Sequence, residues 1–230
     1  MARVLLTGPV RGLEHYAEAA RSVGWEPLEL PLLEIRERPL ELAARPDWIC
    51  LSSSNALFAL EPHRDALALV PCAVVGHATA ERLVEAGFRL ELEPAENASR
   101  LADALIARVA AADRGATRVL WPHGSQAREL GDRLAWAGFD VDRPVVYETL
   151  ARESVRELPD AEAIFFASPS AVERYLRIAD ETRTVPAAIA IGETTAQALR
   201  TMAAGRFAST ARLETPDPAA LGVCLERWRS

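Results

Sequence analysis

The sequence predicts an α/β protein built from two similar halves, each with a doubly wound sheet of parallel strands. Short apolar runs alternate with amphipathic stretches along the 230 residues, which is the pattern of strands and helices in this class. The chain also repeats itself, with three pairs of equivalent positions 115 or 116 residues apart: Val4 and Val119, Ile49 and Ile164, Gly76 and Gly192. Three unlike units that recur in one order at one period indicate an internal duplication.

The first repeat contains the elements of one such half. Its expected strands are 3–7, 48–51, 72–75 and the short run 90–93, with a long extended segment at 26–35. Its expected helices are 13–23, one that begins near 56, one that runs to about 86, and 99–112. Ser99 is the expected N-terminal cap of the last helix.

The second repeat follows the same order. Its expected strands are 118–121, 163–167 and 188–191, with a long extended segment at 141–149 that matches 26–35. Its expected helices are 127–137, one that runs to about 178, one that begins after Gly192, and 218–228. Strands that alternate with helices in this way place ligands outside the carboxyl ends of the strands.

The stretch AIAIGETTAQAL, at 188–199, is typical of the turns that follow the strands. Gly192 permits a tight turn, and Thr194 or Thr195 is expected to cap the next helix. Free N–H groups and the positive end of the helix dipole favour an anion at such a turn. Gly76 and Thr79 occupy the same places in the first repeat. The pattern therefore predicts one anion-binding turn in each half.

Other turns after strands are also rich in small hydroxyl, amide and glycine residues, and two lobes leave a cleft that favours a ligand. The expected ligand-binding residues are Thr7; Ser52, Ser53 and Asn55; Gly76 and Thr79; His123, Gly124 and Ser125; Ser168 and Ser170; Gly192, Thr194 and Thr195. Such groups suit carboxylates or phosphates spread over a wide ligand. The layout therefore predicts a two-lobed protein that binds a polyanionic small molecule.

Composition excludes several other classes. The sequence has no lysine, which removes both a Walker A lysine and a Schiff-base lysine. A net charge of −7 argues against general nucleic-acid binding, and the apolar runs are shorter than the roughly 20 residues that span a membrane. Three cysteines without CxxC or metal-ligand spacing predict a reduced, cytoplasmic protein that has no metal site.

Seven motifs occur in a fixed order along the chain: VLLTGP from Val4, DWICLSSSNAL from Asp47, AVVGHATA from Ala73, VLWPHGSQAREL from Val119, VVYET from Val145, FFASPSAVERYL from Phe165 and AIGETTAQAL from Ala190. Together they cover essentially the whole chain and resemble the uroporphyrinogen-III synthase family. The resemblance implies two α/β lobes joined by a two-strand linker, with the second lobe inserted into the first. Lobe one would comprise residues 1–37 and 148–230, and lobe two residues 38–147.

The reaction that the resemblance implies is the cyclisation of hydroxymethylbilane to uroporphyrinogen III, with loss of water and inversion of ring D. It needs no metal or organic cofactor. Departure of the hydroxymethyl oxygen leaves an azafulvene cation, and ring closure passes through a spiro intermediate. The substrate carries eight carboxylates, which explains anion-binding turns in an acidic protein, and Arg11 and Arg128 are expected to add local positive charge. A monomer that receives its substrate from the preceding enzyme of tetrapyrrole biosynthesis is expected.

Tyr147, in VVYET, is the expected catalytic residue, because the matching tyrosine of the family faces the cleft and would donate a proton to the leaving hydroxyl. The alternative is an aromatic ring that only packs on a connecting strand. Simple helix capping is likewise the alternative for the threonines, and a surface position in a turn is the alternative for His123 as an acid. Two departures from the family pattern are Gly8, where an arginine is frequent, and Ala167, where a threonine is frequent.

A different class of function fits the same scaffold, namely a non-catalytic sensor of a tetrapyrrole or another polycarboxylate. Such a protein would keep the anion-binding turns and tolerate the loss of Tyr147, so a Tyr147→Phe variant separates the two hypotheses. A third hypothesis, a two-domain nucleotide or sugar transferase, requires a fingerprint such as GxGxxG, which the sequence lacks.

Overall fold

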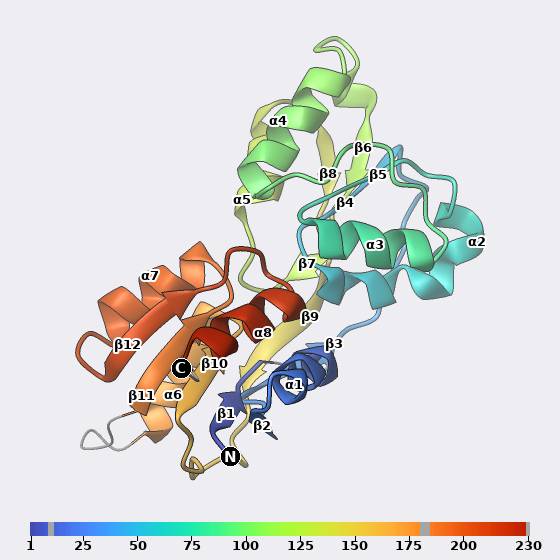
Figure 1. Cartoon of the computed structure of the whole chain (residues 1–230). Coiled ribbons are helices and arrows are strands. Elements are labelled where there is room, and N and C mark those ends of the chain that lie inside the picture. The colour runs from blue at the N-terminus through green and yellow to red at the C-terminus, as the bar shows by residue number, and fades with distance from the viewer. Residues whose placement is uncertain (9–11, 180–184, 229–230) are drawn as a thin grey trace. The chain divides into compact units, whose positions relative to one another are not determined.

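The computed structural model describes residues 1–8, 12–179 and 185–228 and contains two compact units. The first unit comprises residues 1–34 and 150–230, and the second comprises residues 35–149 (Figure 1). The first unit is therefore assembled from both ends of the chain, whereas the second is continuous. Each unit has a parallel sheet with its own hydrophobic core, which confirms the predicted α/β class.

The sheet of the first unit has the strand order β12-β11-β10-β1-β2, with every neighbouring pair parallel. Its strands are β1 (Arg3–Leu6), β2 (Glu26–Glu29), β10 (Ala163–Phe166), β11 (Val185–Ala190) and β12 (Phe207–Arg212). The apolar run of β10 is buried along its whole length, because helices cover both faces of the sheet.

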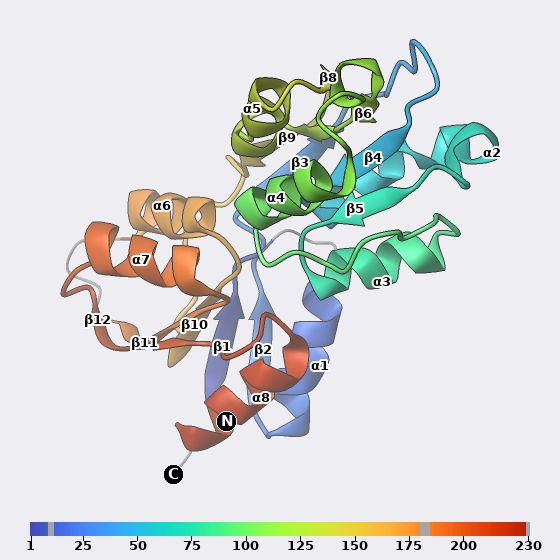
Figure 2. The ribbon, with the colours of Figure 1, turned by 90° about the horizontal axis from the view of Figure 1, so that it is seen from above.

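Alternate residues of the strands supply two cores, one on each face of this sheet. Helices α1 (Leu13–Ser22) and α8 (Pro218–Arg227) cover the face that contains Val4 and Leu6. Helices α6 (Pro169–Ile178) and α7 (Glu193–Met202) cover the opposite face, which contains Leu5 (Figure 2). This arrangement is that of a doubly wound sheet.

The sheet of the second unit has the order β5-β4-β6-β8 and is also parallel throughout. Its strands are β4 (Trp48–Leu51), β5 (Cys72–Val74), β6 (Arg118–Leu120) and β8 (Asp140–Asp142). One face packs against η1 (Ser54–Ala59), α2 (Arg64–Leu67) and α3 (His77–Glu85), and η2 (Glu61–His63) lies between η1 and α2 in the chain. The other packs against α4 (Ala98–Arg108) and α5 (Glu129–Trp136), and η3 (Arg114–Ala116) precedes β6.

The two sheets reproduce the sequence repeat in their strand order and register. Leu5 of β1 pairs with Ile164 of β10, and the equivalent positions Leu120 of β6 and Ile49 of β4 pair in the same way. The order β11-β10-β1-β2 in one unit therefore corresponds to β5-β4-β6-β8 in the other. Each sheet takes strands from both repeats, so the structural units and the sequence repeats are out of phase.

A third sheet, with the order β3-β9-β7, contains the segments at which the chain passes between the units. Its strands are β3 (Leu33–Glu37), β7 (His123–Gly124) and β9 (Val145–Ala151). The long segments expected at 26–35 and 141–149 are each divided into two strands of different sheets, β2 with β3 and β8 with β9. Pro31 and Pro144 lie in the two breaks, where the missing N–H prevents a continuous ladder.

Three local predictions are wrong. Asn97, not Ser99, caps α4, because its side chain accepts a hydrogen bond from the Arg100 N–H. Residues 90–93 form no strand, and only an isolated bridge joins Leu90 to Cys72. The helix expected from about residue 56 is the 3-10 segment η1, which begins at Ser54.

Candidate functional site

The carboxyl ends of neighbouring parallel strands bring the predicted turns together within each unit. In the first unit, Thr7, Ser168 and Gly192 follow the adjacent strands β1, β10 and β11. In the second unit, the turns after β4, β5 and β6 adjoin in the same way. Each unit therefore has one sheet edge at which hydroxyl groups and backbone N–H groups gather.

Two hydroxyls of the first unit have different environments. Ser168 is half-buried and caps α6, with its Oγ accepting a hydrogen bond of 3.2 Å from the Ala171 N–H. Its own hydroxyl proton remains available to an acceptor on a ligand. Thr7 is fully buried, and its hydroxyl donates to the Phe165 carbonyl oxygen at 2.9 Å. Thr7 therefore ties β1 to β10 rather than offering its side chain to solvent.

The turn before α7 departs from the predicted capping arrangement. Gly192 is the N-cap residue and no side chain caps the helix, so neither Thr194 nor Thr195 has the predicted capping role. Thr194 is exposed in the first helical turn, whereas Thr195 is 1% exposed and belongs to the packed face. The prediction failed because the N-cap is Gly192, two residues before Thr194 and three before Thr195, so both threonines lie inside the helix.

Charged side chains surround the same turn. Glu193 lies in the first turn of α7 and forms ion pairs with Arg200 at 2.5 Å and Arg212 at 3.3 Å. The hydrogen bond from Arg200 lowers the pKa of the Glu193 carboxyl, and the charges of both arginines act in the same direction. Two guanidinium groups therefore lie beside the N-terminus of α7.

In the second unit, the turn after β4 is bound by side chains from two other elements. Ser52 accepts a hydrogen bond of 3.2 Å from the Trp121 indole N–H, and Ser53 caps η1 by accepting from the Asn55 N–H at 3.2 Å. Ser54 accepts from Arg82 Nη1 at 3.3 Å. These contacts fix the positions of three successive hydroxyl groups.

Arg82 is a site residue that the sequence analysis did not identify. It is half-buried on α3 and lies one helical turn after Thr79, with its guanidinium at the turn that follows β4. Within the described residues it forms no ion pair, although arginines elsewhere in this acidic chain repeatedly pair with carboxylates. The spacing of three residues from Thr79 is the signal that could have indicated it, because residues three apart share a helix face.

The turn before α3 differs from its counterpart before α7. Gly76 is the N-cap residue with a φ of 80°, in the left-handed region that favours glycine. Gly192 has a φ of −165°, which is extended backbone that any residue adopts. Thr79 is 7% exposed, so it packs against the core as Thr195 does. Equivalent glycines in the two repeats therefore have different structural roles.

His123 is held inside the second unit. It is 8% exposed, and its ring stacks on Trp121 with the ring centroids 4.2 Å apart. Nδ1 lies 2.8 Å from the Gly124 carbonyl oxygen, and Nε2 lies 3.1 Å from the Arg143 carbonyl oxygen. Both ring nitrogens therefore face protein acceptors rather than an open surface.

Tyr147 lies on β9 directly beside β7. It pairs with Gly124 across the two strands, and the exposed Ser125 donates its backbone N–H to the Tyr147 carbonyl oxygen at 3.0 Å. The ring is half-buried against the core cluster of the second unit. In the described part of the chain, no hydrogen bond engages the Tyr147 hydroxyl. The backbone of Tyr147 is therefore held by its pairing with β7, and within the described residues its hydroxyl remains available as a proton donor.

The remaining predicted positions have mixed outcomes. Asn55 and Ser170 are half-buried in their turns, and Arg128 is exposed immediately before α5. Arg11 lies outside the described residues.

The two departures from the family pattern, Gly8 and Ala167, are in contact, because a Cβ atom at Gly8 would come within 2.9 Å of the Ala167 Cβ. A small residue at each position therefore permits the close approach of the other.

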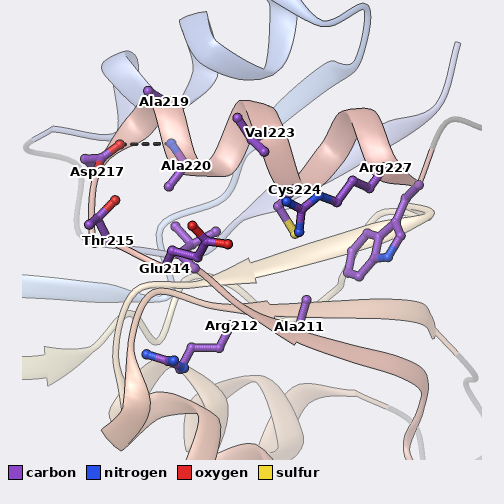
Figure 3. Close-up of a pocket in the computed structure, with 12 residues that line it drawn as sticks. Ala211, Arg212, Glu214, Thr215, Asp217, Ala219, Ala220, Val223, Cys224 and Arg227 are labelled. Carbon is purple, nitrogen blue, oxygen red and sulfur yellow. Dashed lines mark hydrogen bonds between the residues drawn. The ribbon is translucent and has the colours of Figure 1, made fainter.

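A cavity of about 470 Å³ in the first unit lies between β12 and α8 (Figure 3). Ala220, Val223, Cys224 and Arg227 of α8 line one side of it, and none of the predicted site residues reaches it. Burial raises the pKa of the Cys224 thiol, which disfavours the reactive thiolate. Arg212, which pairs with Glu193 at the turn before α7, also lines the cavity, so the cavity adjoins the carboxyl end of β12.

No helix of the described residues is both long and apolar enough to cross a membrane. Across residues 1–8, 12–179 and 185–228, no group of three or more His, Cys, Asp or Glu side chains is arranged to hold a metal ion.

Comparisons with known proteins identify the family through one family model and the fold through solved structures. A protein-family model described as "Uroporphyrinogen-III synthase HemD" matches residues 14–215. The uroporphyrinogen-III synthetase of Helicobacter pylori has a similar structure, with a TM-score of 0.68 and 20% identity over 99% of this chain and 100% of that one. A mutant uroporphyrinogen III synthase of Thermus thermophilus has a TM-score of 0.62 and 20% identity over 100% of this chain and 98% of that one. No curated protein sequence matches the chain. At this identity the structural likenesses show the fold alone.

Proposed function

The chain belongs to the uroporphyrinogen-III synthase family, and from this premise we propose how its residues perform the reaction. The family closes hydroxymethylbilane to uroporphyrinogen III in tetrapyrrole biosynthesis, as a cyclising lyase that releases water. We propose that Tyr147 is the proton donor in this chain and that the strand-end turns of each unit bind substrate carboxylates.

The free hydroxyl of Tyr147 is the observation that carries the proposal. A phenol O–H is a hydrogen-bond donor, and a positioned tyrosine can act as a general acid. Donation to the hydroxymethyl oxygen lets that oxygen leave as water, and the pyrrole nitrogen supplies the electrons that form the azafulvene cation. Ring closure and rearrangement then release one proton, which restores the phenol. The atoms therefore balance, with water as the only product besides the macrocycle.

Carboxylate binding is assigned to the turns that keep free donors. Ser168 and Ser53 cap helices as acceptors and retain their hydroxyl protons, and Thr194 is exposed beside the N-terminus of α7. Arg82 adds a guanidinium without a carboxylate partner among the described residues. A substrate with eight carboxylates requires several such sites, because each exposed contact alone contributes little.

The protein is further proposed to act in the cytoplasm as a monomer that accepts a linear tetrapyrrole from the enzyme that makes it. Light scattering coupled to size-exclusion chromatography should then give a mass near 25.0 kDa. A stable dimer at micromolar concentration would contradict the monomer.

The test is a coupled assay in which the purified protein meets freshly generated hydroxymethylbilane and the oxidised products are separated into type I and type III isomers. The native protein should give predominantly type III. Tyr147→Phe should lower the rate of type III formation about 100-fold, because a positioned general acid contributes on the order of 10²-fold or more. Tyr16→Phe is the matched control, since the Tyr16 hydroxyl already donates to the Pro216 carbonyl oxygen.

Each result has a distinct meaning. Type I alone from the native protein would favour the non-catalytic sensor. A Tyr147→Phe variant as active as the native protein would remove the proton-donor role of Tyr147 and leave the synthase assignment intact. A loss in both tyrosine variants would indicate a general structural effect.

A further inference from the structure

Gly124 lies under the ring of Tyr147 with no space for a side chain. A Cβ atom built at Gly124 would come within 2.6 Å of Tyr147 Cε2, 2.7 Å of Cζ and 3.0 Å of the hydroxyl oxygen. Carbon atoms in proteins do not approach so closely without displacement, because the optimal separation is about 3.5–4.0 Å. The ring therefore occupies the volume that any other residue at 124 would need.

The backbone itself does not require glycine at this position. The glycines with positive φ are Gly12, Gly24, Gly76, Gly87, Gly138 and Gly205, and Gly124 is not one of them. An alanine at 124 would thus adopt the native backbone without torsional strain. Contact with the Tyr147 ring is the steric cost that remains.

We propose that Gly124 is a positioning residue for catalysis, because its missing side chain seats the Tyr147 ring and sets the place of the hydroxyl. This inference rests on the proposed proton-donor role of Tyr147. It assigns Gly124 a role different from the anion-binding backbone that the sequence suggested. The relevant feature is that Gly124 has no Cβ atom on the side that faces the Tyr147 ring.

The strand around Tyr147 is held more firmly than its ring. Backbone hydrogen bonds join Arg38 N to Val146 O at 2.6 Å, Ser125 N to Tyr147 O at 3.0 Å, and His123 N to Pro144 O at 3.1 Å. The Tyr147 ring rotates about two side-chain torsions and is half-buried. It therefore moves more easily than the hydrogen-bonded backbone of β9. A Cβ at 124 therefore moves the hydroxyl and leaves the backbone in place.

A double-mutant cycle tests the proposal with Gly124→Ala, Tyr147→Phe and the double variant. Gly124→Ala should lower kcat for type III formation at least about 10-fold, with little change in KM, because a displacement near 1 Å can cost up to about 10²-fold. In the Tyr147→Phe background the same change should have almost no effect on the remaining rate, because no hydroxyl is left to misplace. Gly115→Ala is the control, since its Cβ would meet nothing closer than 4.0 Å in the same unit.

A spectroscopic measurement separates positioning from general damage. The chain has three tyrosines, so protein grown with 3-fluorotyrosine should give three ¹⁹F signals, of which Tyr147→Phe identifies one. Gly124→Ala should shift that signal and leave those of Tyr16 and Tyr175, which lie in the first unit, unchanged. If Gly124→Ala alone fails to fold, Gly124→Ala with Tyr147→Leu should fold, because the shorter side chain vacates the volume.

The outcomes distinguish this inference from the function on which it rests. Full activity in Tyr147→Phe would overturn the proton-donor role itself. A large loss in Tyr147→Phe together with native activity in Gly124→Ala would overturn only the positioning role. Equal fold losses from Gly124→Ala in both backgrounds, or an unshifted ¹⁹F signal, would also overturn it, because the effect would not pass through the hydroxyl.

Discussion

At the scale of single residues, two polar side chains of the second unit, those of Tyr147 and Arg82, are candidates to act on a ligand. Within the described residues no hydrogen bond engages the Tyr147 hydroxyl, and the Arg82 guanidinium bonds to Ser54 but has no carboxylate partner. Polar groups that the fold leaves without a full set of partners are candidates to bind a ligand, since structural polar groups are normally satisfied. We therefore propose separable functions for the two residues, with Tyr147 acting on the reacting oxygen and Arg82 on a remote carboxylate.

Arg82→Gln should raise KM about 10-fold and leave kcat within about twofold of native. A charge-assisted hydrogen bond to a carboxylate contributes roughly 1.5 kcal/mol or more, and loss of binding that is equal in ground and transition states raises only KM. Arg89→Gln is the control, since Arg89 is already paired with Glu91. The measurement is steady-state kinetics of type III formation. An unchanged KM, or a fall in kcat alone, would contradict the assignment.

Alanine substitutions at Gly76 and Gly192 distinguish the effect of backbone strain on stability from the effect of an added methyl group on ligand binding. Gly76→Ala should destabilise the protein by about 1–3 kcal/mol, because its φ of 80° with ψ of 142° is strained for any residue with a Cβ. Gly192→Ala should leave stability unchanged, because its backbone is extended and a Cβ there meets nothing within 4 Å. The methyl would nonetheless occupy the approach to the N-terminus of α7 and raise KM for the substrate. Urea unfolding and steady-state kinetics of both variants check this contrast, which equal stability losses would refute.

At the scale of elements, helix caps explain how the chain defines the turns around its strand ends. Ser53 and Ser168 are equivalent in the two repeats and both accept a hydrogen bond from a backbone N–H of the following helix. The elements that follow nevertheless differ, because η1 is a 3-10 segment whereas Pro169 begins the regular α6. Equivalent caps therefore preserve the turn while the helix behind it changes.

Asp217 caps α8 and should make part of the stability depend on pH. Its carboxylate accepts from the Ala220 N–H at 2.9 Å, and hydrogen bonds from the Thr215 hydroxyl and from Ala220 lower its pKa. A carboxyl with a lowered pKa in the folded state stabilises the fold above its unfolded pKa, near about 3.9, and loses that contribution as the pH falls through the folded value.

Asp217→Ala should therefore cost about 1 kcal/mol at pH 7, the usual contribution of an N-cap. The difference in free energy of unfolding between the Asp217→Ala variant and the native protein should stay constant down to about pH 4 and become smaller at lower pH. Asp217→Asn is the control, because asparagine caps a helix without titrating. Urea unfolding at pH 7 and pH 3 measures the difference, and an equal difference at both values would exclude the ionised cap.

The strands and the order of elements could be predicted from the sequence because their signals are local. The run AIFF at 163–166 is fully buried, and its apolar character alone identifies a central strand. The backbone conformation within the turns could not be predicted, since Gly76 and Gly192 are both glycines at equivalent positions but have different φ angles. The contact between Gly124 and Tyr147 was also hidden, because the two residues are distant in sequence and only the pairing of β7 with β9 brings them together.

At the scale of the whole molecule, the boundaries of the sequence repeats differ from the boundaries of the structural units. Each sheet combines strands of both repeats, so the pairs β1 with β10 and β4 with β6 join segments that are far apart along the chain. Such long-range pairing has no local signal in the sequence. The periodicity therefore indicates the duplication but not which strands share a sheet.

Two fragments of equal length distinguish the structural units from the sequence repeats as units of folding. Residues 35–149 contain both core clusters of the second unit and should fold alone, with one cooperative urea transition and dispersed amide NMR signals. Residues 1–115 lack β6, so Trp48 and Ile49 lose their partners on that strand, and Trp121 and Leu134 are missing from the core. This equally long fragment should unfold without a cooperative transition. Cooperative folding of 1–115 together with disorder of 35–149 would reverse the assignment and make the sequence repeat the unit that folds.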